Sequence, residues 1–271
     1  MAKRTITALL LLAVAMPAVL FGGMAFFLLI GFFIVVASRE YVIMFRAAGA
    51  QPSAPVVIGG TALLLTLRGF FPEWAGAALS GLVLVAMAVH LYAYERGRDH
   101  AATDLAVTIA GFIYLGWIGA YLVDLRNLPD GGWWLMLVLP CVWGADTGAY
   151  IIGSTYGKHK MAPRLSPKKS WEGYVAGIVM GTYVGALFTW AFNVNTFVGR
   201  LTISPWEGAL LGFVLSVVPT LGDLGESMFK RQGGIKDSGA VIPGHGGAFD
   251  RIDSWLWGAV IGVYWIRFFF L

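Results

Sequence analysis

The chain has 271 residues, of which 58% are hydrophobic and only 13% are charged. Soluble domains carry about 25% charged residues, and a soluble core cannot absorb this much apolar surface, whereas lipid-facing helices can. The composition therefore excludes an ordinary soluble domain and predicts an all-α bundle of transmembrane helices, a single integral membrane domain over residues 1–271.

The formal net charge of +4 does not require a nucleic-acid partner. Basic residues of membrane proteins concentrate in cytoplasmic loops, and we attribute the excess charge to such loops. The single cysteine, Cys141, lies in an apolar run and excludes an intramolecular disulfide. Without a cluster of Cys and His residues, the sequence also argues against a zinc centre.

Apolar runs of about membrane-spanning length recur along the chain. Residues 5–36 fit one long tilted helix, but Gly22-Gly23 offers a break, and treating this stretch as two helices gives about nine spans. The predicted helices are 5–21, 24–46, 54–71, 74–94, 102–123, 132–153, 171–193, 204–221 and 254–270.

The distribution of basic residues indicates the orientation of these spans. If the N-terminus and every second loop share one side, that side receives all but four of the 19 Lys and Arg residues, the exceptions being Arg68, Arg126, Arg200 and Arg267. Since Lys and Arg mark the cytoplasmic side, nine spans place the N-terminus in the cytoplasm and the C-terminus outside. Merging the first two helices would move the N-terminus away from the cytoplasm and fits less well.

Residues 221–253, which we call the polar segment, differ in composition from the rest of the chain. Asp223 and Glu226 are three residues apart, as are Asp250 and Asp253, so on a helix each pair shares a face. Proteins usually hold Mg²⁺ through one or two carboxylates together with substrate phosphates and water. The two acidic faces therefore predict a site for a hard cation.

The polar segment also carries the groups that phosphate binding requires. Lys230, Arg231, Lys236 and Arg251 lie among the carboxylates, and such side chains suit phosphate oxygens. Glycines at 233–234, 244 and 246–247 allow the backbone to approach a ligand closely. A solvated loop with ion pairs would explain the charge. It would not explain why glycine, histidine and carboxylates gather beside span ends, where acidic residues are costly.

A second polar connection, at about residues 154–170, follows an acidic residue in an apolar helix. That residue, Asp146, is either functional or a polar packing contact between helices. Lys168 and Lys169 precede a helix start near Ser170. They are either an ordinary cytoplasmic anchor or a phosphate clamp at a helix N-terminus, where free N–H groups and the helix dipole favour anions.

Three polar residues inside predicted spans favour a structural interpretation. His90 fits a packed, hydrogen-bonded histidine better than a ligand, and the Arg39-Glu40 pair fits an ion pair at the membrane interface.

Residues 227–253 resemble the signature of the phosphatidate cytidylyltransferases (CDP-diacylglycerol synthases): S-x-x-K-R, four residues, K-D, then H-G-G, two residues and D-R-x-D. The D-T-G-A-Y stretch from Asp146 and the S-P-K-K-S-W-E-G stretch from Ser166 look like the same family, so the resemblance covers about 140–255. Ala248 and Ser170 depart from the usual residues of the family, but neither change removes a polar group. The matching residues are Ser227, Lys230, Arg231, Lys236, Asp237, His245, Gly246, Gly247, Asp250, Arg251 and Asp253.

The resemblance implies an enzyme that converts CTP and phosphatidate into CDP-diacylglycerol and pyrophosphate in phospholipid biosynthesis. It implies Mg²⁺, paired with K⁺, and a homodimer in the inner membrane. The distribution of Lys and Arg places both polar connections, and with them the active site, on the cytoplasmic side. Residues 1–130 would then supply membrane helices, and residues 131–271 would carry the catalytic motifs.

The same resemblance assigns roles to individual residues. Asp223 and Asp250 are the first metal ligands it implies, with Asp253 and Glu226 next. The implied catalytic and phosphate-binding residues are Asp146, Lys168, Lys169, Lys230, Arg231, Lys236, Asp237, His245 and Arg251, and the implied ligand-contacting residues are Ser227, Gly246 and Gly247.

Other functions remain open at this point. A related CTP-using enzyme, such as a polyprenol kinase or a synthase of archaeal ether lipids, shares the substrate chemistry but not the long signature. A cation transporter or channel also uses intramembrane carboxylates, but it predicts acids spread along a path through the bilayer. The acids of this chain cluster with cations, which favours binding of a polyanion. A structural membrane scaffold would need neither the clustered acids nor the cations.

Overall fold

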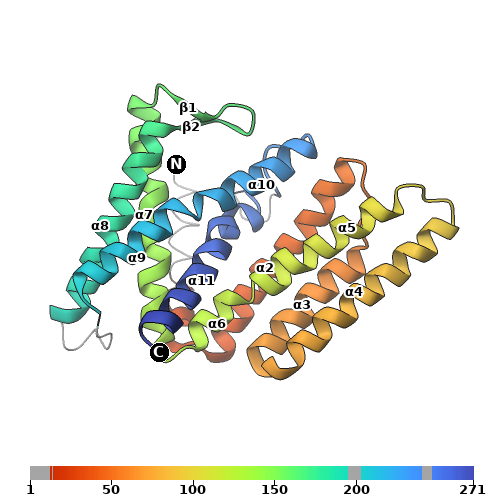
Figure 1. Ribbon diagram of the computed structural model, residues 1–271, viewed down its shortest axis with the longest axis horizontal. Helices are drawn as coiled ribbons and strands as arrows, with labels where there is room; N and C mark the ends of the chain where they lie inside the picture. The colour runs from red at the N-terminus through yellow and green to blue at the C-terminus, as the bar shows by residue number, and fades with distance from the viewer. Residues whose placement is uncertain (1–12, 14, 195–202, 240–245) are drawn as a thin grey trace. The chain divides into compact units, whose positions relative to one another are not determined.

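The computed structural model describes residues 13, 15–194, 203–239 and 246–271, and these residues form helices with one short hairpin of strands (Figure 1). Helix 5–21 predicted from the sequence therefore lies largely outside the described residues, although 15–21 are helical. The elements are α2 (Gly23–Ala47), α3 (Ala54–Phe70), α4 (Pro72–Glu95), α5 (Ala101–Gly111), the π-helix η1 (Phe112–Ile118), α6 (Tyr121–Asn127), α7 (Gly131–Tyr156), β1 (Lys160–Ala162), β2 (Ser166–Ser170), α8 (Trp171–Val194), α9 (Pro205–Val217), α10 (Thr220–Gln232) and α11 (Phe249–Phe269).

The predicted all-α fold of membrane type is confirmed. Within the described residues, six helical stretches are long and apolar enough to cross a membrane, and α3 is apolar but shorter, with 17 residues. The chain is therefore an integral membrane protein, and the total of nine spans stays a prediction. The six stretches are Gly23–Ala47, Pro72–Glu95, Ala101–Asn127, Gly131–Tyr156, Trp171–Asn193 and Pro205–Gln232.

The helical conformation is interrupted at the glycine pair near the N-terminus. Gly22 and Gly23 have φ of 66° and 56°, in the left-handed region that glycine enters without a steric penalty. A helical ladder does not continue through two such residues, so α2 is a separate helix from residues 15–21.

The structure differs from the prediction at 102–123, where one helix was expected. The stretch is α5, then η1, then α6, and a π-helix is rare because its wider turn packs less well. Gly116 of η1 lies so close to α3 that an added Cβ would be 2.9 Å from the Cα of Thr61. The missing side chain at this position allows η1 and α3 to pack backbone against backbone.

The chain divides into two compact units, which are described separately. Unit 1 contains residues Met1–Asp124 and Met228–Asp253, and unit 2 contains Leu125–Ser227 and Ser254–Leu271. The core of unit 1 is built around Val56, Leu64, Ala86 and Phe112, all of which are buried.

In unit 2, α8 packs against α7 and α9 through glycines. A Cβ on Gly177 of α8 would lie 2.7 Å from the carbonyl oxygen of Ala145 in α7. A Cβ on Gly185 would overlap the carbonyl oxygen of Gly208 in α9 and lie 3.2 Å from the Cα of Gly212. Small residues allow the close helix approach on which packing in lipid depends.

We expect Gly185→Ala to destabilise unit 2. The new methyl would meet backbone, which cannot move aside as a side chain can, and overpacking of this kind costs about 1–3 kcal/mol. Thermal unfolding of the purified protein in detergent would measure the loss. Gly76→Ala on α4 is the matched control, since nothing lies within 4 Å of a Cβ there. Equal midpoints for the two variants would contradict the packing argument.

The polar segment is more helical than the sequence indicated. Pro219 has no N–H to continue the ladder of α9, so the predicted helix 204–221 ends at Val217, and α10 then runs to Gln232. Helix α11 begins at Phe249 rather than at 254. Both acidic pairs of the polar segment therefore lie on helices, three residues apart on one face.

Candidate active site

A cavity of about 610 Å³ in unit 2 brings together residues of the two polar connections. Asp146 comes from α7, Lys168 and Lys169 come from β2, and Asp223 comes from α10. All four are site residues predicted from the sequence, and they line this one cavity. The remaining lining residues are Ala145, Ala149, Tyr150, Gly153, Ser154, Gly157, Lys160, Met161, Ser170, Gly173, Tyr174, Gly177, Ser216 and Thr220.

The two lysines lie on a hairpin of two strands, where the sequence predicted a polar connection. Strands β1 and β2 pair antiparallel, and β2 leads directly into α8. Ser170 caps α8, since its Oγ accepts a hydrogen bond of 3.2 Å from the backbone N–H of Gly173. Glu172 accepts from the backbone N–H of His159, which ties the start of the hairpin to the same helix end.

An ion pair joins the hairpin to α10. Lys169 Nζ lies 2.5 Å from Asp223 Oδ2, and the two side chains are 25% and 33% exposed. Lys168 is exposed on the same strand and also lines the cavity. The cavity thus presents three lysines, Lys160 included, and two carboxylates, groups suited to a nucleotide's phosphates and a divalent cation.

One turn along α10, Glu226 is 1% exposed and Ser227 is 8% exposed. A buried carboxylate is costly unless a cation or hydrogen-bond donors surround it. The carboxylates Asp223 and Glu226 offer the hard oxygen ligands that Mg²⁺ prefers, so the donor set of α10 fits this metal.

A second group of predicted residues lies in unit 1, around the carboxylate of Asp250. Its Oδ1 accepts a hydrogen bond of 2.6 Å from Lys230 Nζ. Its Oδ2 accepts from the backbone N–H of Ser238 (3.0 Å), from Ser238 Oγ (2.9 Å) and from the backbone N–H of Gly247 (2.9 Å). Asp250 therefore positions both the ammonium group of Lys230 and the glycine loop of the polar segment.

These contacts keep Asp250 ionised. Burial raises the pKa of the carboxyl, but the hydrogen bonds from Lys230, Gly247 and Ser238 and the charge of Lys230 lower it to about 2. Because the folded-state pKa is depressed, the stabilisation is present above the unfolded pKa of about 3.9 and is lost as the pH falls toward 2. Near neutral pH the group is a carboxylate.

The two glycines of the signature are required for this arrangement. Gly246 has φ of 83°, and a Cβ there would lie 2.9 Å from Asp250 Oδ2. A Cβ on Gly247 would overlap Ser238 Oγ and lie 2.7 Å from Glu40 Oε1. The structure thus gives Gly246 and Gly247 a role in close backbone packing. The predicted contact with a ligand stays a prediction.

The other predicted residues of the polar segment differ in burial. Arg231, Lys236, Asp237 and Arg251 are exposed, as phosphate-binding or solvated residues are, whereas Asp253 is 8% exposed. His245 lies outside the described residues.

Sequence reasoning missed Glu40, which had been interpreted as the partner of Arg39 in an interfacial ion pair. That interpretation is wrong for Glu40, because the residue is 2% exposed and its carboxylate accepts hydrogen bonds from Ser238, Ala248 and Phe249 of the polar segment. The available signal was that Glu40 is the only acidic residue in predicted span 24–46, where an acid is costly. By contrast, the interpretation of His90 is confirmed, since its Nε2 lies 2.8 Å from Thr108 Oγ1.

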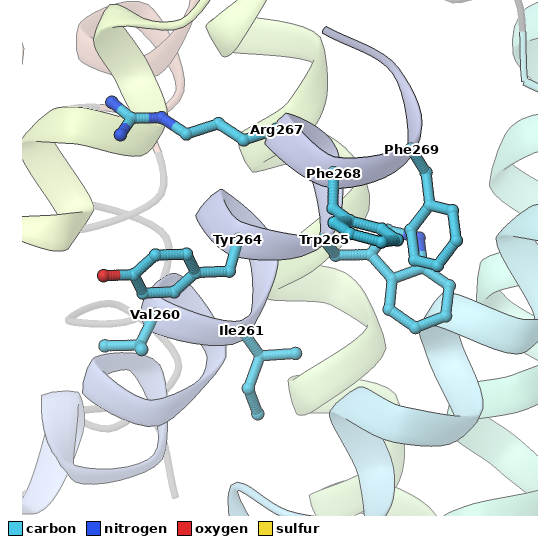
Figure 2. Close-up of a pocket in the computed structure, with 7 residues that line it drawn as sticks. All are labelled: Val260, Ile261, Tyr264, Trp265, Arg267, Phe268 and Phe269. Carbon is cyan, nitrogen blue, oxygen red and sulfur yellow. The ribbon is translucent and has the colours of Figure 1, made fainter.

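A separate hollow of about 580 Å³ lies in unit 2 along the end of α11 (Figure 2). Its lining comes from this one helix and is almost wholly apolar, and Arg267 extends away from Trp265 and Phe269 in the view. It holds no carboxylate and none of the predicted site residues. This hollow therefore does not fit the predicted reaction site.

Comparison with known proteins decides the family. The sequence model of the cytidylyltransferase family matches residues 2–269. The chain belongs to this family. It is similar to the phosphatidate cytidylyltransferase of Synechocystis, with 32% identity over 97% of this chain and 96% of the relative.

Other members give the same result. The chain is 35% identical to the phosphatidate cytidylyltransferase of Mycobacterium leprae, over 84% of this chain and 75% of the relative. It is 34% identical to that of Staphylococcus haemolyticus, over 94% of this chain and 95% of the relative. The family assignment thus extends over the N-terminal half, where the sequence alone offered hydrophobic character and no part of the family signature.

Proposed function

We propose that the chain transfers the cytidylyl group of CTP to phosphatidate and produces CDP-diacylglycerol and pyrophosphate. The observation that carries the proposal is similarity to phosphatidate cytidylyltransferases of 32–35% identity over most of the chain. The site chemistry supports it, because the lysines and carboxylates suit a reaction between two polyanions.

The reaction forms one phosphoanhydride bond and breaks another. A phosphate oxygen of phosphatidate attacks the α-phosphorus of CTP, and the bond between the α-phosphorus and the bridging oxygen of the β-phosphate breaks, so that pyrophosphate leaves. The nucleophile is already an anion, so no strong general base is required. The barrier comes mainly from repulsion between the substrates, which cationic groups and positioning reduce.

The cavity of unit 2 supplies cations for this purpose. We assign Lys168 and Lys169 to the phosphates of CTP, with Asp223 holding Lys169 in place through their ion pair. In unit 1, Lys230, held by Asp250, has its ammonium fixed for contact with a phosphate. Arg231, Lys236 and Arg251 are exposed cations assigned to the same chemistry.

Mg²⁺, with K⁺ beside it, is part of the proposal. The carboxylates assigned to it are Asp223, Glu226, Asp250 and Asp253, a set of oxygen ligands suited to a hard cation. When bound, such a metal neutralises phosphate charge and stabilises the departing pyrophosphate.

We further propose nine spans with a cytoplasmic N-terminus, a site facing the cytoplasm at the inner membrane, and a homodimer. The distribution of Lys and Arg supports the orientation. A site at the level of the lipid headgroups would allow a membrane lipid and a soluble nucleotide to meet.

The test is a turnover assay with the purified full chain in mixed micelles. Labelled CTP with phosphatidate should give CDP-diacylglycerol and an equal amount of pyrophosphate. Dolichol and an archaeal ether-lipid acceptor serve as competing substrates. Absence of CDP-diacylglycerol, or preferential phosphorylation of dolichol, would refute the proposed function.

Withholding Mg²⁺ gives an independent prediction. Chelation by EDTA should reduce turnover at least about 100-fold, since the metal provides several kcal/mol of charge stabilisation, and added Mg²⁺ should restore it. The control is EDTA already saturated with Mg²⁺, which should leave turnover unchanged. Full activity in excess EDTA would rule out the metal requirement.

A further inference from the structure

Glu40 of α2 is buried, and in the part of the chain that the structure describes its carboxylate accepts hydrogen bonds from the polar segment. Glu40 Oε1 accepts from the backbone N–H of Ala248 (3.0 Å). Glu40 Oε2 accepts from the backbone N–H of Phe249 (2.9 Å) and from Ser238 Oγ (3.0 Å). Three donors converge on one side chain that lies 198 to 209 residues away in the sequence.

Two of these donors belong to the start of α11. The first N–H groups of a helix have no partner within it, and a side chain just before the helix usually accepts from them. Gly247 and Ala248 precede Phe249 and carry no side-chain oxygen. Glu40 supplies the missing acceptor from another helix, and its negative charge also favours the helix N-terminus.

The third donor connects Glu40 to Asp250. The Ser238 hydroxyl lies 3.0 Å from Glu40 Oε2 and 2.9 Å from Asp250 Oδ2, and it accepts from the backbone N–H of Asp250 at 3.3 Å. A hydroxyl has one proton, so it donates to one carboxylate at a time. The orientation of the Ser238 hydroxyl therefore depends on both Glu40 and Asp250.

Aromatic residues of α2 also pack beside Lys230, the cationic partner of Asp250. The rings of Tyr41 and Phe45 lie 5.7 Å and 5.3 Å from the ring of Phe229, centroid to centroid. Phe229 immediately precedes Lys230, whose ammonium pairs with Asp250. Neighbouring residues of α2 thus fix both halves of the Lys230–Asp250 pair.

We propose that Glu40 is a positioning residue of the active site: it caps α11, orients Ser238 and thereby sets the carboxylate of Asp250. Its effect on turnover rests on the proposed function, whereas its effect on the polar segment does not. Replacement by glutamine keeps the size of the side chain but places an NH₂ group against at least one of the three donors.

The first experiment is hydrogen exchange on the full chain in detergent, without metal or substrate. Glu40→Gln should speed amide exchange in peptides covering 246–253 by at least about tenfold, because their capping acceptor is lost. The matched control is Glu73→Gln, the same change at an exposed position of α4, which should leave exchange in these peptides unchanged. Unchanged exchange in Glu40→Gln would overturn the proposal.

The second experiment separates positioning from stability. Turnover per folded molecule should fall about 10–100-fold in Glu40→Gln, as for other residues that orient a functional side chain, and Glu73→Gln should remain active. Ser238→Ala should also lower turnover, and the double variant should be little worse than Glu40→Gln alone, because both act through Asp250. Fully additive losses, or a fall in stability with normal turnover per folded molecule, would contradict the proposal.

Two further outcomes, a misfolded Glu40→Gln variant and an inactive wild-type protein, still leave the proposal testable. If Glu40→Gln does not fold, Ser238→Ala carries the test, and normal exchange and turnover in that variant would overturn the connection to Asp250. If the wild-type protein makes no CDP-diacylglycerol, the proposed function fails, and the exchange experiment still decides whether Glu40 holds the polar segment.

Discussion

Asp250→Asn is expected to reduce CDP-diacylglycerol formation by at least about 100-fold, the scale on which loss of one electrostatic group affects catalysis. The carboxylate of Asp250 accepts from Lys230, Ser238 and Gly247. Asparagine has one acceptor oxygen and would turn its NH₂ group toward one of these donors. Initial rates at saturating CTP, per folded molecule, would measure the loss.

The control for Asp250→Asn is the same substitution at Asp99, an exposed residue between α4 and α5. It should retain wild-type turnover. Thermal unfolding of both variants in detergent would show whether Asp250→Asn remains folded. A folded Asp250→Asn protein with wild-type turnover would remove Asp250 from both the metal-binding and the phosphate-binding assignments.

Lys169→Met should lower kcat/KM for CTP about 100-fold, because the cavity loses a cation that we propose contacts phosphate. Asp223→Asn should lower it as well, since Lys169 Nζ lies 2.5 Å from Asp223 Oδ2 and depends on it for its position. The double variant should lose less than the product of the two single losses, because the residues are in direct contact. Steady-state kinetics with varied CTP would test all three variants.

Lys158→Met is the matched control for Lys169→Met. Lys158 is an exposed lysine just before the same hairpin, and its side chain does not line the cavity. We expect wild-type kinetics from it. If Lys158→Met and Lys169→Met were equally impaired, the effect would come from the general positive charge of the loop rather than from the cavity.

Most of the fold could be predicted from the sequence, because membrane helices have a strong local signal. A run of apolar residues long enough to cross the bilayer defines a helix without reference to its neighbours, and α2, α3, α4, α7 and α8 agree with prediction to within a few residues. The exceptions have local geometric causes. The π-helix and the hairpin β1–β2 have no periodic hydrophobic pattern that reveals them.

The candidate site was predictable to the extent that its residues are close in sequence or share a motif. Asp223 and Glu226 are neighbours on a helix, so their spacing alone indicated one acidic face. Lys169 and Asp223 are far apart in the sequence, and only the folded hairpin shows that they form an ion pair.

The sequence by itself determined that this is a polytopic membrane protein with a polar segment of carboxylates, cations and glycines. The family signature within that segment indicated a cytidylyltransferase reaction. Only the tertiary structure showed that Glu40 of α2 caps α11 and contacts Ser238. The physical reason is that hydropathy and helical period describe each helix alone. The partner of a buried charge is set by which helices pack together.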